Sequence, residues 1–198
     1  NMGIQVYGGH GYIKSNRQEQ IVRDSRISAV WEGTTQIQAL DLLGRKILLE
    51  GKLKPINYHC SLLYKDCKDL MFSGASSSVK SHAWRLLKET ASLHFNTYRI
   101  ASKGQSNRDC IGLASQDYLM VAGYINMGHH WLKMEEAAAK KIASGEGDQA
   151  FYEAKMKSAE FYFENIFPRV ASHKLTMHAP INSVMSMKEE EFSFDHAL

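Results

Sequence analysis

The sequence predicts an all-α protein. Three prolines interrupt 198 residues, so few positions forbid a helix. Strands would show as an alternation of apolar and polar positions rich in β-branched residues, and such alternation is scarce. Apolar residues spaced three and four apart recur along most of the chain instead. These observations together favour helices that pack on helices.

Glycines cluster near the start of the chain. Residues 5–12 read QVYGGHGY, with three glycines within four positions. Glycine permits a positive φ and allows backbone amides to approach another surface closely. Considered by itself, the stretch fits a helix stop with a turn as well as it fits a loop that binds a phosphate.

A short helix is predicted over residues 18–28, before a turn at residues 31–33. Arg23 and Asp24 are neighbours in sequence, so they project from different sides of this helix and need not pair with each other. We expect each of them to be a structural ion-pair partner of another residue.

A second helix is predicted to follow the turn and to end at residues 50–51. Thr34 or Thr35 can cap its start through a hydroxyl. Apolar residues then recur at helical spacing, namely Ile37, Leu40, Leu43, Ile47 and Leu48. Glu32 therefore precedes a helix N-terminus, where the helix dipole stabilises an anion, whereas apolar contact with Trp31 would disfavour the charged form. From this position alone, Glu32 is either a tuned base or a helix cap.

A domain boundary is predicted at the polar link over residues 52–55, since Pro55 suits the start of a new helix. The predicted domains are residues 1–51 and residues 52–198. Four apolar stripes in the second domain predict helices near residues 56–72, 84–101, 114–142 and 152–170. An antiparallel four-helix bundle would bury all four stripes.

The second apolar stripe of the predicted domain is regular, and the third is interrupted. In the helix near residues 84–101 the stripe consists of Trp84, Leu87, Ala91, His94, Tyr98 and Ala101. The next stripe is interrupted by a charged residue at Glu135 and is stopped by the glycines at residues 145–147.

Composition excludes several classes of function. A net charge of +3 is too mild for a nucleic-acid-binding protein, which usually carries a clustered basic patch. No apolar run reaches the roughly 20 residues of a membrane-spanning helix. Cys60, Cys67 and Cys110 lack the C-x-x-C spacing of zinc and redox sites, so we expect reduced structural thiols and a cytoplasmic location.

Histidines do not predict a metal site. His129 and His130 are adjacent, so their side chains diverge by about 100° around a helix and cannot readily share one ion. His94 lies on an apolar stripe, where a hydrogen-bonded histidine is more common than a metal ligand.

Three motifs together resemble the closing segment of the flavin-dependent acyl-CoA dehydrogenases. They are residues 5–12 (QVYGGHGY), residues 20–27 (QIVRDSRI) and residues 31–38 (WEGTTQIQ), in the family's order and spacing. Trp31 replaces the more familiar tyrosine, which keeps an aromatic wall but changes the shape of the acyl pocket. The bundle and residues 179–192 resemble the subgroup that carries an extra C-terminal helical domain.

The resemblance implies specific roles for the residues of the turn. Glu32 would be the general base that removes the pro-R α-proton of an acyl-CoA while the β-hydride passes to N5 of FAD. The backbone of Glu32 would also bind the thioester carbonyl, and Gly33 would allow the substrate to approach closely. Thr34 and Gln36 resemble contacts to the flavin diphosphate.

The glycine cluster takes a role from the same resemblance. Gln5, Gly8 and Gly9 resemble the loop that meets the FAD of a neighbouring subunit, which favours the anion-binding interpretation. The product would be a trans-2-enoyl-CoA, and an electron-transferring flavoprotein would accept the electrons. A bacterial enzyme that forms homo-oligomers is expected.

The start of the chain predicts a fragment, because Asn1 precedes apolar residues without a cap or a polar lead. The resemblance then implies that most of the flavin and acyl pocket lies elsewhere, so the fragment alone would be inert. Two alternatives to the dehydrogenase stay open. One is a non-catalytic helical module for subunit contacts, and the other is an acyl-CoA oxidase, which passes electrons to oxygen.

Overall fold

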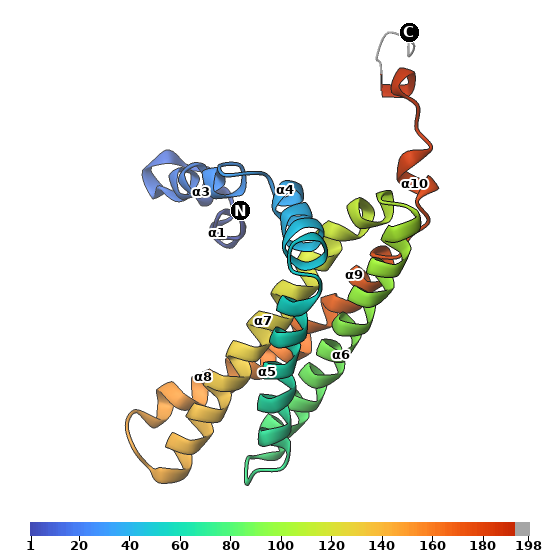
Figure 1. Ribbon diagram of the computed structural model, residues 1–198. Coiled ribbons are helices and arrows are strands. Elements are labelled where there is room, and N and C mark those ends of the chain that lie inside the picture. The colour runs from blue at the N-terminus through green and yellow to red at the C-terminus, as the bar shows by residue number, and fades with distance from the viewer. Residues whose placement is uncertain (193–198) are drawn as a thin grey trace. The chain divides into compact units, whose positions relative to one another are not determined.

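The computed structural model of the protein describes residues 1–192, and every regular element in that range is a helix (Figure 1). The all-α prediction is confirmed. The chain forms two compact units, which are residues 1–38 and the residues from Ala39 onward. The last six residues of the predicted second domain, 193–198, lie outside the described range.

Short helices make up the first unit. They are α1 (Met2–Tyr7), α2 (Gly9–Tyr12), the 3₁₀ turn η1 (Lys14–Asn16), α3 (Gln18–Arg26) and the 3₁₀ turn η2 (Ile27–Ala29). Within residues 1–38, only Gly11 is buried, while apolar side chains such as Val6 and Tyr12 are more than four-fifths exposed, at 84% and 83%. This unit therefore has hardly any core of its own.

The polar side chains of α3 pair along the helix. Arg23 Nε lies 2.7 Å from a carboxylate oxygen of Glu19, and the Gln20 amide donates to Asp24 over 2.7 Å. The prediction of an ion pair is confirmed for Arg23, whereas Asp24 accepts from the neutral Gln20 amide instead of pairing with a cation. Both contacts join residues four apart, which are neighbours on a helix surface.

The predicted helix after the turn is present but is not one regular α-helix. It begins as α4 (Thr35–Leu40) and continues as the π-helical segment η3 (Asp41–Leu49). Leu43 and Ile47 are buried in the core of the second unit. The second compact unit thus begins at Ala39, before the predicted domain boundary between residues 51 and 52. That boundary divides the family's domains rather than packing units, and it stays a prediction.

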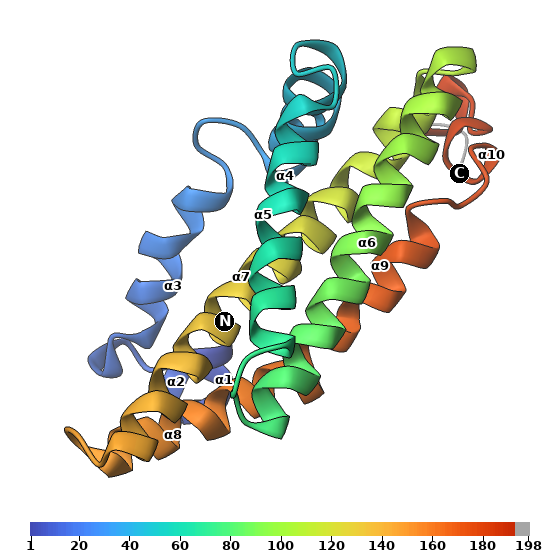
Figure 2. The same ribbon diagram turned by 60° about the horizontal axis from the view of Figure 1, so that its bottom comes forward.

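Three long helices form the body of the second unit. α5 (Lys54–Met71) packs against α6 (Ser77–Ser106), and α6 packs against α7 (Asp109–Ser144), as Figures 1 and 2 show. The Ser76 hydroxyl caps α6 by accepting from the Val79 N–H. Gly145 ends α7 in the left-handed conformation, with φ 67°. The predicted glycine stop is confirmed.

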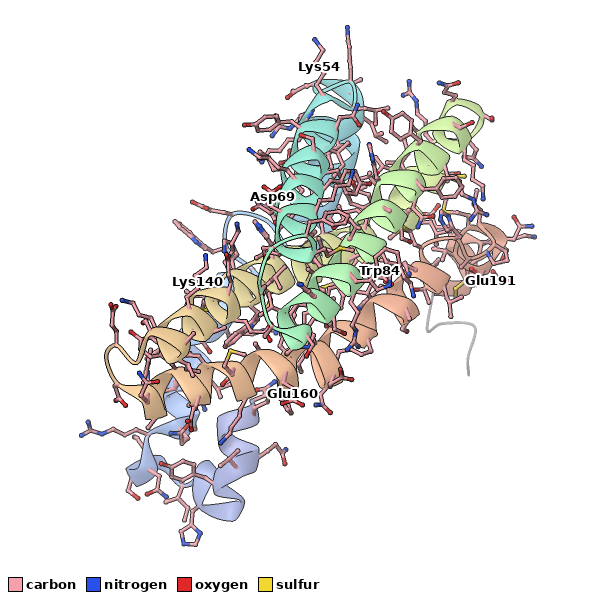
Figure 3. The ribbon with its side chains drawn as sticks, turned by 90° about the horizontal axis from the view of Figure 1, so that it is seen from below. Lys54, Asp69, Trp84, Lys140, Glu160 and Glu191 are labelled. Carbon is pink, nitrogen blue, oxygen red and sulfur yellow. The ribbon has the colours of Figure 1, made fainter. Side chains whose placement is uncertain are left out.

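The fully buried face of α6 lies one residue before the predicted stripe, although Leu87 of that stripe is partly buried against the core. Trp84, labelled on α6 in Figure 3, is 55% exposed, and Ala91 is exposed as well. The face that packs inward contains residues one position earlier, namely Ala83, Leu86, Thr90, Leu93, Thr97 and Ile100. Two of them are threonines whose hydroxyls donate to backbone carbonyls one turn back. That bond makes a polar residue compatible with a core position.

The fourth apolar stripe is helical throughout but is divided into segments. They are α8 (Gln149–Phe161), the π-helical segment η4 (Tyr162–Ile166), the 3₁₀ turn η5 (Phe167–Arg169) and α9 (Val170–Thr176). Pro168 lacks the N–H that a continuous helix needs, and its ring clashes with the preceding turn. α8 and α9 pack against α7, so a bundle of four regular helices is not confirmed in that detail. Two short turns follow, α10 (Asn182–Met185) and η6 (Glu189–Phe192).

Burial changes the chemistry of the α5 thiols. Desolvation raises the pKa of Cys60 to about 11 and that of Cys67 to about 12. All three cysteines are free, so the prediction of reduced thiols agrees with the structure. Among residues 1–192, no helix is both long enough and apolar enough to cross a membrane.

Candidate active site

The turn that carries Glu32 is held in an uncommon backbone conformation. The N–H groups of Val30 and Trp31 both donate to the carbonyl of Ile27, which closes the chain before the turn. Glu32 then has a φ of 61°, and Gly33 has a φ of 109°. A non-glycine residue in the left-handed region costs roughly 1–2 kcal/mol, so a carboxylate at this position is held there by its surroundings.

Gly33 cannot be replaced without strain. A Cβ at this position would lie 3.0 Å from Gln38 Nε2 and 3.2 Å from Cγ2 of Ile37. The positive φ disfavours a side chain independently of this crowding. The turn therefore needs glycine immediately after the acid and just before α4.

The carboxylate of Glu32 is exposed in this chain, and Trp31 is 63% exposed. The expected apolar contact between these two side chains does not bury the acid. Thr34 precedes the first residue of α4, and its carbonyl accepts from the Gln38 N–H over 3.0 Å. Glu32 thus lies at the head of α4, as predicted, with its side chain open to solvent.

Thr34 and Gln36 are brought next to Glu32 and Gly33 by this turn and the first turn of α4. Thr34 is exposed and Gln36 is half-buried. Four of the predicted site residues therefore occupy one short stretch of backbone. The structure shows their positions, and their roles stay predictions.

The remaining predicted cofactor residues, Gln5, Gly8 and Gly9, lie where α1 meets α2. The Gly8 N–H donates to the Gln5 carbonyl over 3.1 Å, and Gly8 has a φ of 58°. A Cβ at Gly8 or Gly9 would meet no heavy atom within 4 Å. The backbone here is a break between two short helices, and its open face is compatible with close approach of an anionic group such as a flavin diphosphate.

The histidines form polar contacts between helices. His129 Nε2 lies 2.8 Å from a carboxylate oxygen of Asp66, which also pairs with Lys133 over 3.0 Å. His130 is exposed. His94 lies within hydrogen-bonding distance of Tyr64 and Asn57, as expected of a hydrogen-bonded core histidine. In the part of the chain that the structure describes, no three histidine, cysteine or acidic side chains are grouped as a metal site requires.

One contact at the turn was not predicted. The Gln38 side-chain amide donates to the backbone carbonyl of Glu32, so Gln38 reaches back across the turn from the first turns of α4. The available signal in the sequence was a glutamine six residues after the acid at the start of a helix. That spacing carries no information until the direction of the turn is known.

Comparison with known families covers most of the chain. Residues 60–188 match the family described as "Acetyl-CoA dehydrogenase C-terminal like", and residues 1–48 match "Acyl-CoA dehydrogenase, C-terminal domain". The two matched ranges define the class of protein, which is the helical C-terminal domains of acyl-CoA dehydrogenases. The interval between them contains the predicted boundary at residues 51 and 52.

Individual relatives agree with this class. The chain is 32% identical over 84% of its length to 3-methylmercaptopropionyl-CoA dehydrogenase of Ruegeria pomeroyi, of which it covers 28%. It is 27% identical over 96% of its length to the broad-specificity linear acyl-CoA dehydrogenase FadE5 of Mycobacterium tuberculosis, of which it covers 32%. Over 21% of the chain it is 42% identical to 11% of subunit CarC of the caffeyl-CoA reductase-Etf complex of Acetobacterium woodii.

The chain therefore belongs to the acyl-CoA dehydrogenase family. It spans about a third of the length of the first two relatives, at 28% and 32%. The resemblance inferred from the three motifs is confirmed by these matches.

Proposed function

We propose that the protein containing this chain catalyses the FAD-dependent α,β-dehydrogenation of acyl-CoA thioesters, with Glu32 as the catalytic base. One observation carries the proposal. In a chain of this family, Glu32 is an acid in a left-handed turn at the head of α4, exposed and followed by a glycine that has no room for a side chain. A carboxylate that served only to cap a helix would not require this strained backbone.

The chain's own residues would move one proton and orient one carbonyl. A Glu32 carboxylate oxygen takes the proton from the substrate Cα, and the Cα–H electron pair becomes the second bond of Cα=Cβ as hydride leaves Cβ. The bound flavin supplies the acceptor for that hydride. The Glu32 backbone would bind the thioester carbonyl and so make the α-proton more acidic, while Gly33 allows the thioester to approach closely.

The open backbone at Gly8 and Gly9 supports an anion-binding role next to Gln5, and Thr34 and Gln36 would contact the flavin diphosphate near the base. Helix starts and glycine-rich breaks suit phosphate because an anion can approach their backbone N–H groups closely. In a homo-oligomer, these two segments would serve the flavins of different subunits. The residues present therefore fit FAD.

The partners follow from the same proposal. Both longer relatives bear names of acyl-CoA dehydrogenases, which supports an acyl-CoA substrate. The CarC relative is named as a subunit of an Etf complex, which supports an electron-transferring flavoprotein as the electron acceptor. These relatives are bacterial, which supports a bacterial protein, and a cytoplasmic location stays a prediction. The isolated chain would be inactive without the remaining pocket.

The test replaces Glu32 by glutamine in the complete protein. Flavin binding should be unchanged, because the substitution keeps the shape of the side chain. Bleaching of the flavin by an acyl-CoA should slow by about 10²- to 10⁴-fold, the usual contribution of a general base. Glu19→Gln on α3 is the matched control and should bleach at the wild-type rate.

The other outcomes have definite meanings. Undiminished bleaching in Glu32→Gln would overturn the assignment of the base. A complete wild-type protein that is colourless and resists reconstitution with flavin would point to the non-catalytic helical module. Release of peroxide during turnover would identify an acyl-CoA oxidase, so peroxide is measured alongside reduction of an electron-transferring flavoprotein.

A further inference from the structure

Gln38 makes two hydrogen bonds to the turn that carries Glu32. The Gln38 Nε2 donates to the Glu32 carbonyl oxygen, while the Gln38 backbone N–H donates to the Thr34 carbonyl over 3.0 Å. One residue therefore ties the turn to α4 twice, once through its backbone and once through its side chain. This arrangement fixes the peptide unit that joins Glu32 to Gly33.

We propose that Gln38 is a positioning residue for the Glu32 base, a role that rests on the function proposed above. The Glu32 carbonyl oxygen turns with the Glu32 ψ angle. Holding that oxygen therefore fixes how the Glu32 Cα and its side chain are set relative to α4. Gln38 does not have to touch the substrate or the flavin to act in this way.

The conformation of the turn explains why a clamp is needed. Glu32 and Gly33 are consecutive residues with positive φ, at 61° and 109°. A non-glycine residue relaxes out of this region unless its surroundings hold it there. The Glu32 side chain is exposed, so packing around the carboxylate does not provide that constraint within this chain.

Gly33 and Gln38 are matched to each other. A Cβ on Gly33 would lie 3.0 Å from Gln38 Nε2, which is the atom that makes the hydrogen bond. The glycine thus leaves the path of the Gln38 side chain open, whereas a side chain at this position would crowd the Gln38 amide. The two positions act as a unit in setting the direction of the acid.

The first experiment examines the clamp in the isolated 198-residue chain by NMR. A coupling across the hydrogen bond from the labelled Gln38 side-chain nitrogen to the Glu32 carbonyl carbon should be observed. The Glu32 backbone coupling constant should report a positive φ, and Gln38→Ala should shift it towards ordinary values. Gln20→Ala is the matched control, since Gln20 also donates from an exposed helix, to Asp24, and should leave Glu32 unchanged.

The second experiment measures turnover of the complete protein with Gln38→Ala and Gln38→Glu. The second variant keeps the length of the side chain but carries no amide donor. Both should keep the flavin and a KM within about twofold of the wild type, while kcat falls about 10- to 100-fold, as expected when a reacting group is misplaced by about 1 Å. Gln20→Ala should retain the wild-type kcat.

Failure of this inference can be told apart from failure of the proposed function. If the wild type bleaches its flavin and both Gln38 variants keep its kcat, Gln38 does not position the base. If the wild type shows no reaction with any acyl-CoA, the proposed function fails. The NMR result still decides the clamp in that case, because an unchanged Glu32 coupling constant in Gln38→Ala overturns it.

Discussion

His82 Nδ1 lies 2.8 Å from a carboxylate oxygen of Glu135, and both side chains are buried where α6 packs against α7. The other Glu135 oxygen accepts from the Ser78 hydroxyl over 2.7 Å. The His82 ring stacks on Phe163, with ring centroids 4.3 Å apart. Glu135, an interruption in the apolar stripe of α7, thus joins α7 to α6 through satisfied polar contacts, and the His82 ring extends the contact to Phe163 in η4.

Removal of Glu135 should strongly destabilise the protein. Glu135→Ala leaves the buried His82 ring and the half-buried Ser78 hydroxyl without their acceptor, and an unsatisfied buried donor costs about 1–3 kcal/mol of unfolding free energy. Urea unfolding followed by circular dichroism measures this loss. Glu136→Ala is the matched control, because its pair with Lys140 lies at the surface and should change stability by less than about 1 kcal/mol.

An apolar replacement of the pair gives the complementary result. The double variant His82→Leu with Glu135→Leu should recover most of the stability lost in Glu135→Ala, because replacing both partners of a buried hydrogen bond by apolar groups of similar shape changes stability little. Equal losses of unfolding free energy in Glu135→Ala and Glu136→Ala would show that the buried pair contributes no more to stability than the surface pair.

Removal of the Thr97 hydroxyl should cost more unfolding free energy than removal of the Tyr118 hydroxyl. Both residues are fully buried, their oxygens are 2.8 Å apart, and the Thr97 hydroxyl also lies 2.8 Å from the Leu93 carbonyl oxygen. Tyr118→Phe leaves Thr97 bonded to Leu93 and should cost about 0.5–1.5 kcal/mol. Thr97→Val deprives the Tyr118 hydroxyl of this partner and should cost about 1–3 kcal/mol.

The measurement is urea unfolding of the two variants under one set of conditions. The order of the two losses, rather than their absolute size, tests the hydrogen-bond chain from Tyr118 through Thr97 to Leu93. A larger loss of unfolding free energy for Tyr118→Phe than for Thr97→Val would contradict donation from the Tyr118 hydroxyl to the Thr97 hydroxyl.

His178 should make stability depend on pH near neutrality. Burial first, then the charges of Arg99 and Lys103, lower the pKa of His178 below its ordinary value. Its folded-state pKa is thus lower than the unfolded value of about 6.5. The stability that neutral His178 contributes is present above about pH 6.5 and is lost as pH falls through the folded pKa.

The comparison variant is His178→Gln, which keeps an amide donor for Asn96, the residue whose side-chain oxygen lies 2.8 Å from His178 Nε2. The wild type's unfolding free energy relative to this variant should decrease between about pH 7.5 and pH 5.5. Urea unfolding at each pH gives the difference directly. A difference that is constant across this range would contradict the shifted pKa.

Much of the candidate site could be predicted from the sequence. The order acid, glycine, threonine before an apolar helical pattern predicted Glu32 on a turn at a helix start, and the structure has that turn. The clamp by Gln38 could not be predicted, because the turn's direction depends on two consecutive positive φ angles. Glutamate rarely adopts such an angle, so its own sequence preference gave no indication of it.

The long helices were also determined by the sequence itself, because their apolar spacing, the serine cap and the glycine stop are local signals. Which face of α6 turns inward was decided by tertiary structure. Two stripes one residue apart compete on that helix, and burial of Thr90 and Thr97 depends on hydroxyl bonds to carbonyls one turn back. In the same way, Glu135 becomes a core residue only because packing brings His82 to it.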